Sequence, residues 1–297
     1  MVRRICSRLF SITLCGLLLQ LAHAAAAAQK VTISRTVLAG VPAILRVPKL
    51  IKKPVIVLWH GLGPPGSKED LMRALPLDDV PAVKVYLDLP LFGARAPAAG
   101  AETLAQRQAQ DYALQIFAPI VVGAAKELPQ VLTALQQQKC PGANGKIGLF
   151  GFSAGGAAVL LALTDPKIPV GVAITVNAPA GLEPAIEALE RATQRPYAWS
   201  DASRELAQRT DPMLHVREIA TRQPPPAILL IHGAEDTAIP SARSVSLEKT
   251  LRPFYAKAGA EDRLSLVIAP GVSHSWADAP SADQLRHQIA EWLNRYL

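Results

Sequence analysis

Short apolar runs rich in β-branched residues recur along the chain and alternate with segments of helical pattern. The run at residues 54–59 (PVIVLW) is continuously apolar, which is typical of a strand buried on both faces of a parallel sheet. Later segments repeat this pattern. We predict further strands at residues 83–89, 146–152, 170–176, 227–231 and 264–269.

Residues 31–47 alternate apolar and polar positions around Ala39-Gly40, which predicts an antiparallel hairpin. Between the strands we predict a short helix capped by Ser67, a helical region at 102–139 interrupted at Pro119 and Pro129, and helices at 154–164 and 281–297. An opening hairpin followed by alternating strands and helices predicts an α/β fold with a mostly parallel, doubly wound sheet.

One stretch, residues 178–226, contains no predicted strand. It holds two polar helical patterns, near 183–193 and 202–209, and ends in three prolines. Such an insertion is best placed above the strand ends, as a small helical cap or an extended crossover. No linker or repeat divides the remainder, so we predict one domain over residues 29–297.

The N-terminal segment differs from this pattern. Three arginines (Arg3, Arg4 and Arg8) precede or begin an apolar stretch over 9–22, and Ala22-His23-Ala24 has the small residues of a cleavage site. Residues 1–28 are therefore predicted to be a cleaved signal peptide, which implies a secreted or periplasmic protein with no stable membrane insertion. An uncleaved anchor is the alternative, and lipidation at Cys15 is disfavoured because Leu14 is too large.

Composition narrows the class further. The chain has 297 residues, of which 50% are hydrophobic and 19% charged, so it is neither disordered nor fibrous. Removal of residues 1–28 takes away three arginines and no acids, which lowers the net charge from +7 to +4. No run of five basic residues exists, so we expect no nucleic-acid partner. Cys140 would remain as the one cysteine, which excludes an internal disulfide. The oligomeric state stays open.

The motif Gly151-Phe152-Ser153-Ala154-Gly155 lies between a predicted strand and a predicted helix. This is G-x-S-x-G in the strand–turn–helix context that exposes a nucleophilic serine. The glycines on either side of Ser153 let the strand and the helix approach closely. The alternative is an ordinary glycine-rich turn.

A serine nucleophile needs a general base, and His274 follows the last predicted strand in a loop before the final helix. This is the place of the base in the chain order Ser, acid, His. His60 and His232 each end a strand and precede a glycine. A functional role stays open for both, and their main role is interpreted as turning the chain.

The acid that orients the histidine is expected in a loop that follows a strand between Ser153 and His274. Asp236 meets this condition, whereas Asp211 and Asp262 precede strands. The alternative role for Asp236 is to cap the helix that follows it.

Two backbone amides are predicted to hold the oxyanion. One is the amide of Ala154, and the other is that of Leu62, in the His60-Gly61-Leu62-Gly63 turn after the strand at 54–59. Phe92 and Trp276 are candidates for the wall of a substrate pocket. A plain turn for Phe92, and packing against the last helix for Trp276, are the alternatives.

Two competing chemistries are weaker. Gly61-x-Gly63-x-x-Gly66, with Asp88 at the end of the next strand, resembles a dinucleotide fingerprint, but Pro64 and Pro65 remove amides that a pyrophosphate would need. The histidine and carboxylate sets 283–287–291 and 211–215–218 supply one histidine each, which is few for a metal site. We therefore expect no cofactor and no metal.

Together these residues resemble the α/β-hydrolase superfamily, over roughly residues 31–297. The matching segments are His60-Gly61 and residues 88–95, 151–156, 232–236 and 271–274. Within the superfamily, the segment 211–240 is similar to secreted esterases related to dienelactone hydrolases and to prolyl-oligopeptidase-type catalytic domains. Dienelactone hydrolases carry a cysteine where this chain has Ser153, and the peptidases carry a propeller domain for which 297 residues leave no room.

The resemblance implies a serine hydrolase that cleaves small-molecule carboxylic esters through Ser153, His274 and Asp236 and an acyl-enzyme intermediate. A serine peptidase or an acyltransferase with the same triad is the first alternative. A non-catalytic α/β binding protein that keeps the turn for structural reasons is the second.

Overall fold

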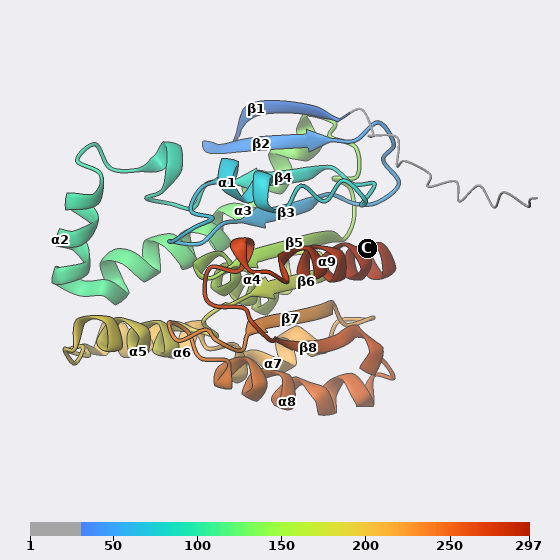
Figure 1. Ribbon diagram of the computed structural model, residues 1–297. Coiled ribbons are helices and arrows are strands. Elements are labelled where there is room, and N and C mark those ends of the chain that lie inside the picture. The colour runs from blue at the N-terminus through green and yellow to red at the C-terminus, as the bar shows by residue number, and fades with distance from the viewer. Residues whose placement is uncertain (1–30) are drawn as a thin grey trace, which may run out of the picture.

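The computed structural model describes residues 31–297, and the predicted signal peptide at 1–28 lies outside the described residues. In this part of the chain the strands form one sheet in the order β1-β2-β4-β3-β5-β6-β7-β8 (Figure 1). The strands are β1 (Thr32–Leu38), β2 (Val41–Val47), β3 (Ile56–Trp59), β4 (Lys84–Leu87), β5 (Ile147–Phe152), β6 (Val170–Val176), β7 (Ala227–Gly233) and β8 (Leu264–Ala269). Every predicted strand is confirmed within a few residues.

The sheet is antiparallel at one side only. β1 pairs with β2 and β2 with β4 in antiparallel register, whereas β4, β3, β5, β6, β7 and β8 are parallel neighbours. The predicted hairpin and mostly parallel sheet are therefore confirmed. Because the strands from β4 to β8 run in one direction, the loops that leave their carboxyl ends gather at one edge.

Helices cover both faces of the sheet because side chains along each strand alternate between two cores. Val57 and Trp59 of β3 belong to the larger core, under the segment that includes α3, α4 and α8. Ile56 and Leu58 point to the opposite core, under α1 and α9. The helices are α1 (Lys68–Ala74), α2 (Ala101–Tyr112), α3 (Gly123–Gln137), α4 (Ala154–Thr164), α5 (Leu182–Thr193), α6 (Asp201–Thr210), α7 (Val216–Ala220), α8 (Ala242–Lys257) and α9 (Ala282–Tyr296).

The predicted interruptions of the long helical region are wrong. The chain breaks at Asp111, which has an extended backbone (φ −166°, ψ 101°). Its carboxylate accepts the amide of Leu114 over 3.0 Å and so begins a new helical segment. Pro119 lies inside this segment, η2 (Ala113–Val122), whose wider π-helical turns accommodate the missing amide, and Pro129 lies inside α3.

The whole stretch Ala101–Gln137 is long and apolar enough to cross a membrane by length and composition. Ile120, Val121 and Leu128 are instead buried in the larger core. We therefore interpret the apolar part of this stretch as a core helix of the fold.

Residues 178–226 contain helices and no strand in the structure, as the sequence indicates. α5 and α6 both contact η2, and Figure 1 shows α2, α5 and α6 together at one side of the sheet. The function of this segment as a cap stays a prediction.

Candidate active site

Ser153 forms the sharp turn between β5 and α4. Its backbone has φ 51° and ψ −120°, a conformation that residues with a side chain rarely adopt. Its amide donates to the carbonyl of Val176, at the end of the neighbouring strand β6, over 2.9 Å. The turn therefore places Ser153 at the carboxyl edge of the sheet, beside the N-terminus of α4.

Glycines make this turn compact. A Cβ on Gly151 would overlap the carbonyl oxygen of Gly155, and one on Gly155 would lie 2.5 Å from the carbonyl oxygen of His60. Gly61 is pressed against the turn from the other side, because a Cβ there would lie 3.0 Å from the Cβ of Ser153. The absent side chains allow α4, β5 and the loop after β3 to meet around the serine.

His274 lies between Ser153 and Asp236. Its Nε2 is 3.0 Å from Ser153 Oγ, and its Nδ1 is 2.8 Å from Asp236 Oδ2. A carboxylate only accepts, so Nδ1 carries the proton and Nε2 is left to accept from the serine hydroxyl. The structure thus brings together the three side chains that the sequence analysis assigned to nucleophile, base and acid.

Asp236 lies in the loop after β7, and its carboxylate is fully buried. Burial alone would raise the pKa of Asp236. The neighbouring His232 and His274 imidazoles and a hydrogen bond from the Ile239 amide outweigh burial and hold this pKa well below its usual 3.8. Asp236 is therefore ionised at neutral pH, as orientation of an imidazole requires.

His232 supports the loop of Asp236. Its Nε2 lies 2.5 Å from the Ile239 carbonyl, which can only accept, so Nε2 is the donor. Its Nδ1 then accepts from the Ser244 hydroxyl of α8 over 2.8 Å. The sequence around His232 does not show this role, because nothing local marks Ser244 as its partner.

The loop of Leu62 provides an unused amide near Ser153. The Gly61 amide donates to the Pro65 carbonyl over 3.2 Å and is already occupied. In the described part of the chain, the amides of Leu62 and Ala154 donate to no loop or turn carbonyl. The Ala154 amide also begins α4, where the helix dipole favours negative charge.

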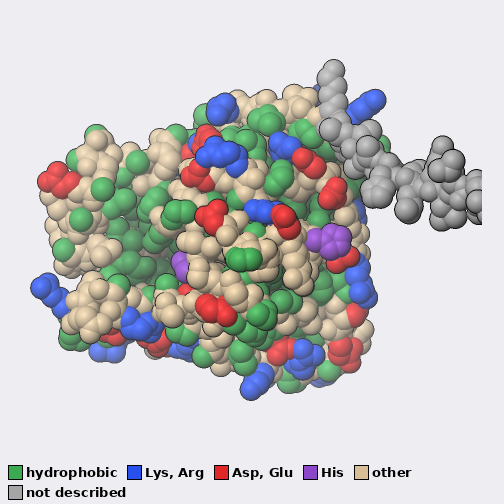
Figure 2. Space-filling model, viewed as in Figure 1, with side chains coloured by type: hydrophobic (Ala, Val, Ile, Leu, Met, Phe, Trp, Pro, Cys, Tyr) green, Lys and Arg blue, Asp and Glu red, His purple; other side chains and the backbone are tan. Residues whose placement is uncertain are grey.

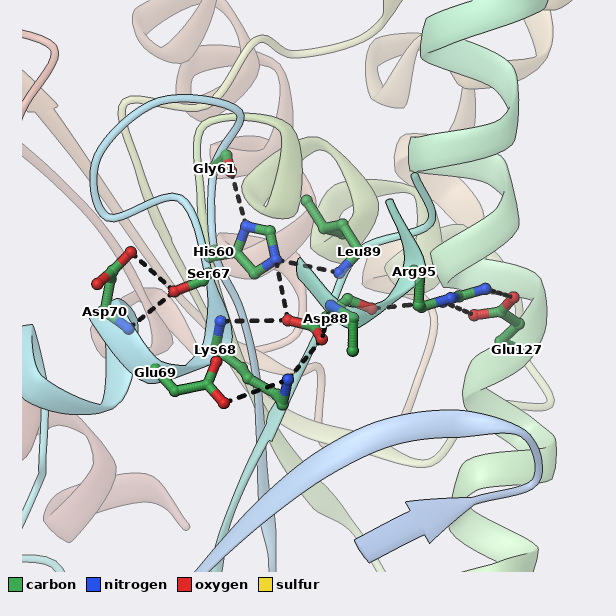
Figure 3. Close-up of polar contacts among 11 residues, drawn as sticks. His60, Gly61, Ser67, Lys68, Glu69, Asp70, Asp88, Leu89, Arg95 and Glu127 are labelled. Carbon is green, nitrogen blue, oxygen red and sulfur yellow. Dashed lines mark hydrogen bonds and ion pairs between the residues drawn. The ribbon is translucent and has the colours of Figure 1, made fainter. Parts of the chain in front are cut away.

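A buried polar network lies behind this loop (Figure 3). His60 is fully buried, with Nδ1 2.7 Å from the Gly61 carbonyl and Nε2 3.1 Å from the Leu89 amide. Burial lowers the pKa of His60 below 6.5, so the ring is neutral at neutral pH. Asp88 accepts from Lys68 Nζ over 2.6 Å.

Asp88 is also the acid of the dinucleotide interpretation. It is 1% exposed, and its carboxylate accepts from Lys68 and from the Ala94 amide over 3.0 Å. Both contacts bind the carboxylate inside the protein with donors of this chain. In the described residues no group of three His, Cys, Asp or Glu side chains is arranged to hold a metal ion.

Phe92 lies in the loop after β4. Its ring is half-buried, and its centroid is 6.2 Å from that of His60 in an edge-on arrangement. Arg95 forms a two-pronged ion pair with Glu127 of α3, with N–O distances of 2.8 and 2.6 Å (Figure 3). This pair anchors the loop of Phe92 to α3.

Trp276 does not line a substrate pocket, which is one of the two roles considered for it. It is 0% exposed and packs edge-on against Phe150, with 6.4 Å between ring centroids, in the core that α9 covers. It therefore offers no exposed surface to a substrate, and the alternative interpretation, packing against the last helix, agrees with the structure.

The face that carries α2 and α5 is hollowed between these helices, with hydrophobic side chains in the hollow (Figure 2). A pocket of about 610 Å³ lies between α2 and the segment after α5, with Gln108, Leu189 and Arg195 in its lining. The Tyr197 hydroxyl donates to Asp111 over 2.6 Å and ties the two walls together.

Solved structures with the same fold include enzymes of two kinds. TT1662 from Thermus thermophilus is 21% identical, with a TM-score of 0.68 over 89% of this chain and 98% of that one. An esterase/lipase from an uncultured bacterium is 17% identical, with a TM-score of 0.56 over 89% and 84%. A puromycin-hydrolysing peptidase from Mycobacterium tuberculosis is 16% identical, with a TM-score of 0.63 over 91% of this chain but 40% of that one. At these identities the likeness establishes the α/β-hydrolase fold alone.

No curated protein matches the sequence. Residues 123–297, more than half of the chain, match the prolyl oligopeptidase family. The matched part carries Ser153, Asp236 and His274 in the order that the fold requires. The chain therefore belongs to the prolyl oligopeptidase family of serine hydrolases.

Proposed function

We propose that this serine hydrolase cleaves carboxylic esters of small molecules through an acyl-enzyme on Ser153. The observation that carries the proposal is the continuous contact from Ser153 Oγ through the His274 ring to the buried, ionised Asp236. This is the geometry in which a histidine removes a proton from a serine hydroxyl.

In the first half of the reaction, Ser153 Oγ attacks the ester carbonyl carbon while His274 Nε2 takes the hydroxyl proton. The negative charge that develops on the carbonyl oxygen is held by the amides of Leu62 and Ala154. Asp236 stabilises the imidazolium. His274 then gives its proton to the leaving oxygen, the alcohol departs, and the acyl group stays on Ser153.

In the second half, His274 takes a proton from water as the water oxygen attacks the acyl carbon. The same two amides hold the second oxyanion. When the carbon–Oγ bond breaks, His274 returns the proton to Ser153, and the carboxylic acid leaves. In each half-reaction His274 passes on the proton that it accepts, first to the leaving alcohol and then to Ser153, so the cycle needs no other proton donor or acceptor.

Esters are favoured over peptides for two reasons. An alcohol is a better leaving group than an amine. Ester cleavage therefore needs less help from substrate-binding contacts than peptide cleavage does. The similar peptidase is matched over only 40% of its chain, so most of that protein has no counterpart in this match. A serine peptidase is the second candidate, and the prolyl oligopeptidase family match favours it.

We also propose that the protein acts outside the cytoplasm. The support is the composition of residues 1–28, where arginines precede an apolar stretch and a small-residue site. Fractionation of cells that express the full chain, followed by N-terminal sequencing, tests this proposal. Mature protein in the periplasm or medium is expected, and uncleaved protein in the cytoplasm would contradict it.

The test of function is hydrolysis of p-nitrophenyl esters from acetate to long acyl chains, beside peptide p-nitroanilides. We expect ester hydrolysis, and a loss of about 10⁴-fold or more in Ser153→Ala. Ser246→Ala is the matched control, because Ser246 is exposed on α8 and donates only to the Ala242 carbonyl.

Labelling by a fluorophosphonate separates the remaining outcomes. Labelling at Ser153 with cleavage of anilides alone would establish the peptidase instead, and ester cleavage that grows with added alcohol would establish an acyltransferase. Absence of both labelling and turnover would show a non-catalytic binding protein. Full activity in Ser153→Ala would overturn the mechanism.

A further inference from the structure

Asn177 is a fully buried polar residue that the steps above do not use. It follows β6 directly and has a left-handed backbone, with φ 50°. Asparagine tolerates this conformation better than most residues with a side chain. Its backbone N–H donates to the Ile231 carbonyl of β7 over 3.0 Å, which fixes the end of β6 against the neighbouring strand β7.

The Asn177 side chain joins two segments of the candidate active site. Its Oδ1 accepts the Gly233 amide over 2.7 Å, at the end of β7. Its Nδ2 donates to the Ser273 carbonyl over 2.8 Å and to the His274 carbonyl over 2.9 Å. Carbonyls only accept and a backbone amide only donates, so one orientation of the Asn177 amide satisfies all three contacts.

These contacts hold the chain on both sides of the triad. Gly233 ends β7 directly before the short loop that carries Asp236, and Ser273 directly precedes His274, the proposed base. The preceding residue, Val176, accepts the amide of Ser153. The end of β6 therefore touches all three segments that carry triad residues, although it supplies none of the triad itself.

We propose that Asn177 is a positioning residue for His274, an inference that rests on the proposed function. Its three side-chain hydrogen bonds fix the His274 backbone and the end of β7 relative to one another. This arrangement keeps His274 Nε2 3.0 Å from Ser153 Oγ and His274 Nδ1 2.8 Å from Asp236 Oδ2. Displacement of a catalytic group by about 1 Å can cost roughly 10²-fold in rate, so the loss of these hydrogen bonds is expected to have a measurable effect.

Two substitutions separate this role from simple stabilisation. Asn177→Gly keeps the left-handed backbone and removes all three side-chain contacts. Asn177→Asp keeps the shape but turns a carboxylate toward two carbonyls that need a donor. Tyr255→Phe is the control, because Tyr255 is also fully buried and donates to the Pro226 carbonyl over 2.7 Å, away from the triad.

We expect folded Asn177→Gly and Asn177→Asp to lose about 10- to 100-fold in kcat and in the rate of fluorophosphonate labelling, with KM changed less than about threefold. Measured as the ratio to wild type at the same pH, acidification that protonates the introduced carboxyl is expected to restore part of the loss in Asn177→Asp. Tyr255→Phe is expected to lower the melting temperature without changing kcat or labelling. Lower stability with unchanged kcat and labelling in the Asn177 variants would overturn the proposal.

A further readout does not depend on turnover. Proton NMR of the wild type is expected to show a downfield resonance from the His274 Nδ1 proton in its hydrogen bond to Asp236. This resonance is expected to shift or broaden in both Asn177 variants and to persist in Tyr255→Phe. If the wild type showed the resonance without hydrolysing any substrate, the proposed function would fail separately. An unchanged resonance in both variants would refute the positioning role.

Discussion

His60 Nδ1 lies 2.7 Å from the carbonyl oxygen of Gly61. The ring is the donor, because a carbonyl only accepts. The Gly61 carbonyl and the Leu62 amide belong to the same planar peptide group, in which the C=O and N–H bonds point in opposite directions. A buried histidine therefore fixes the direction of the amide to which we assign half of the oxyanion hole.

The first prediction follows from this contact. His60→Phe keeps a ring of similar size but removes both hydrogen bonds. We expect kcat for a soluble ester to fall about 10- to 100-fold with little change in KM, because the Leu62 amide is held less firmly in the transition state. The matched control is Tyr255→Phe, which loses a buried hydrogen bond elsewhere. Unchanged kcat in folded His60→Phe would show that another contact orients this peptide.

The sequence predicts the sheet and the approach of Ser153, His274 and Asp236 to one another because these features have local signals. Buried parallel strands are continuous apolar runs, and the turn at Ser153 needs Gly151, Ser153 and Gly155 within five consecutive residues. Asp236 and His274 were found because each follows a predicted strand in a fixed chain order. The structure places these three side chains in one hydrogen-bonded line.

The supporting residues lack such local signals. Asn177 contacts Ser273 and His274, which lie 96 and 97 positions further along the chain, and only the fold brings them together. Trp276 is two residues after His274, yet it points into the core, and sequence spacing does not show on which side of a loop a ring packs. The break at Asp111 was missed because prolines are stronger sequence signals than an aspartate that caps a helix.

A second prediction concerns the space around the turn between β5 and α4. Gly151→Ala places a Cβ into the backbone of Gly155, where no flexible side chain can move aside. We expect a loss of about 3 kcal/mol or more in the free energy of unfolding, or failure to fold. Thermal unfolding and soluble yield are the measurements.

Gly63→Ala is the matched control for this change. A Cβ on Gly63 meets nothing within 4 Å. We expect its stability to stay within about 0.5 kcal/mol of the wild type, which is typical of unobstructed surface positions. Equal stability of Gly151→Ala and Gly63→Ala would contradict the close approach of α4 to β5.

The third prediction concerns the charge of Asp236. Asp236→Asn removes the carboxylate that holds the His274 tautomer, and we expect kcat to fall by roughly 10³- to 10⁴-fold. The wild-type pKa of Asp236 is depressed in the folded protein, so ionised Asp236 stabilises the fold above the usual pKa of 3.8 that it has when unfolded. That contribution is lost as the pH falls through the folded pKa.

Denaturant unfolding of wild type and Asp236→Asn across pH 2.5–7 measures this linkage. The stability difference between the two proteins is expected to be largest above about pH 4 and to shrink below it. A difference that grows on acidification would show that the folded pKa is raised rather than lowered.

Lys84 has a buried charge remote from the triad. It is fully buried on β4, and its Nζ donates to the Val80 carbonyl over 2.8 Å. Burial lowers the pKa of Lys84 from 10.5 to about 8, against the attraction of Asp78. Below pH 8 the ammonium is charged in both the folded and the unfolded protein, so its cost to the fold is fully present there.

Lys84→Met removes this cost and keeps a side chain of similar length. We expect it to raise the free energy of unfolding at pH 7 by about 1–3 kcal/mol. Between pH 8 and 10.5 the unfolded wild type holds a proton that the folded wild type has released, so wild-type stability rises relative to the variant. Urea unfolding at pH 7 and pH 10 measures both effects, with Lys249→Met as the control because Lys249 is exposed on α8. A variant less stable than the wild type at pH 7 would mean that the Val80 contact outweighs the burial of the charge.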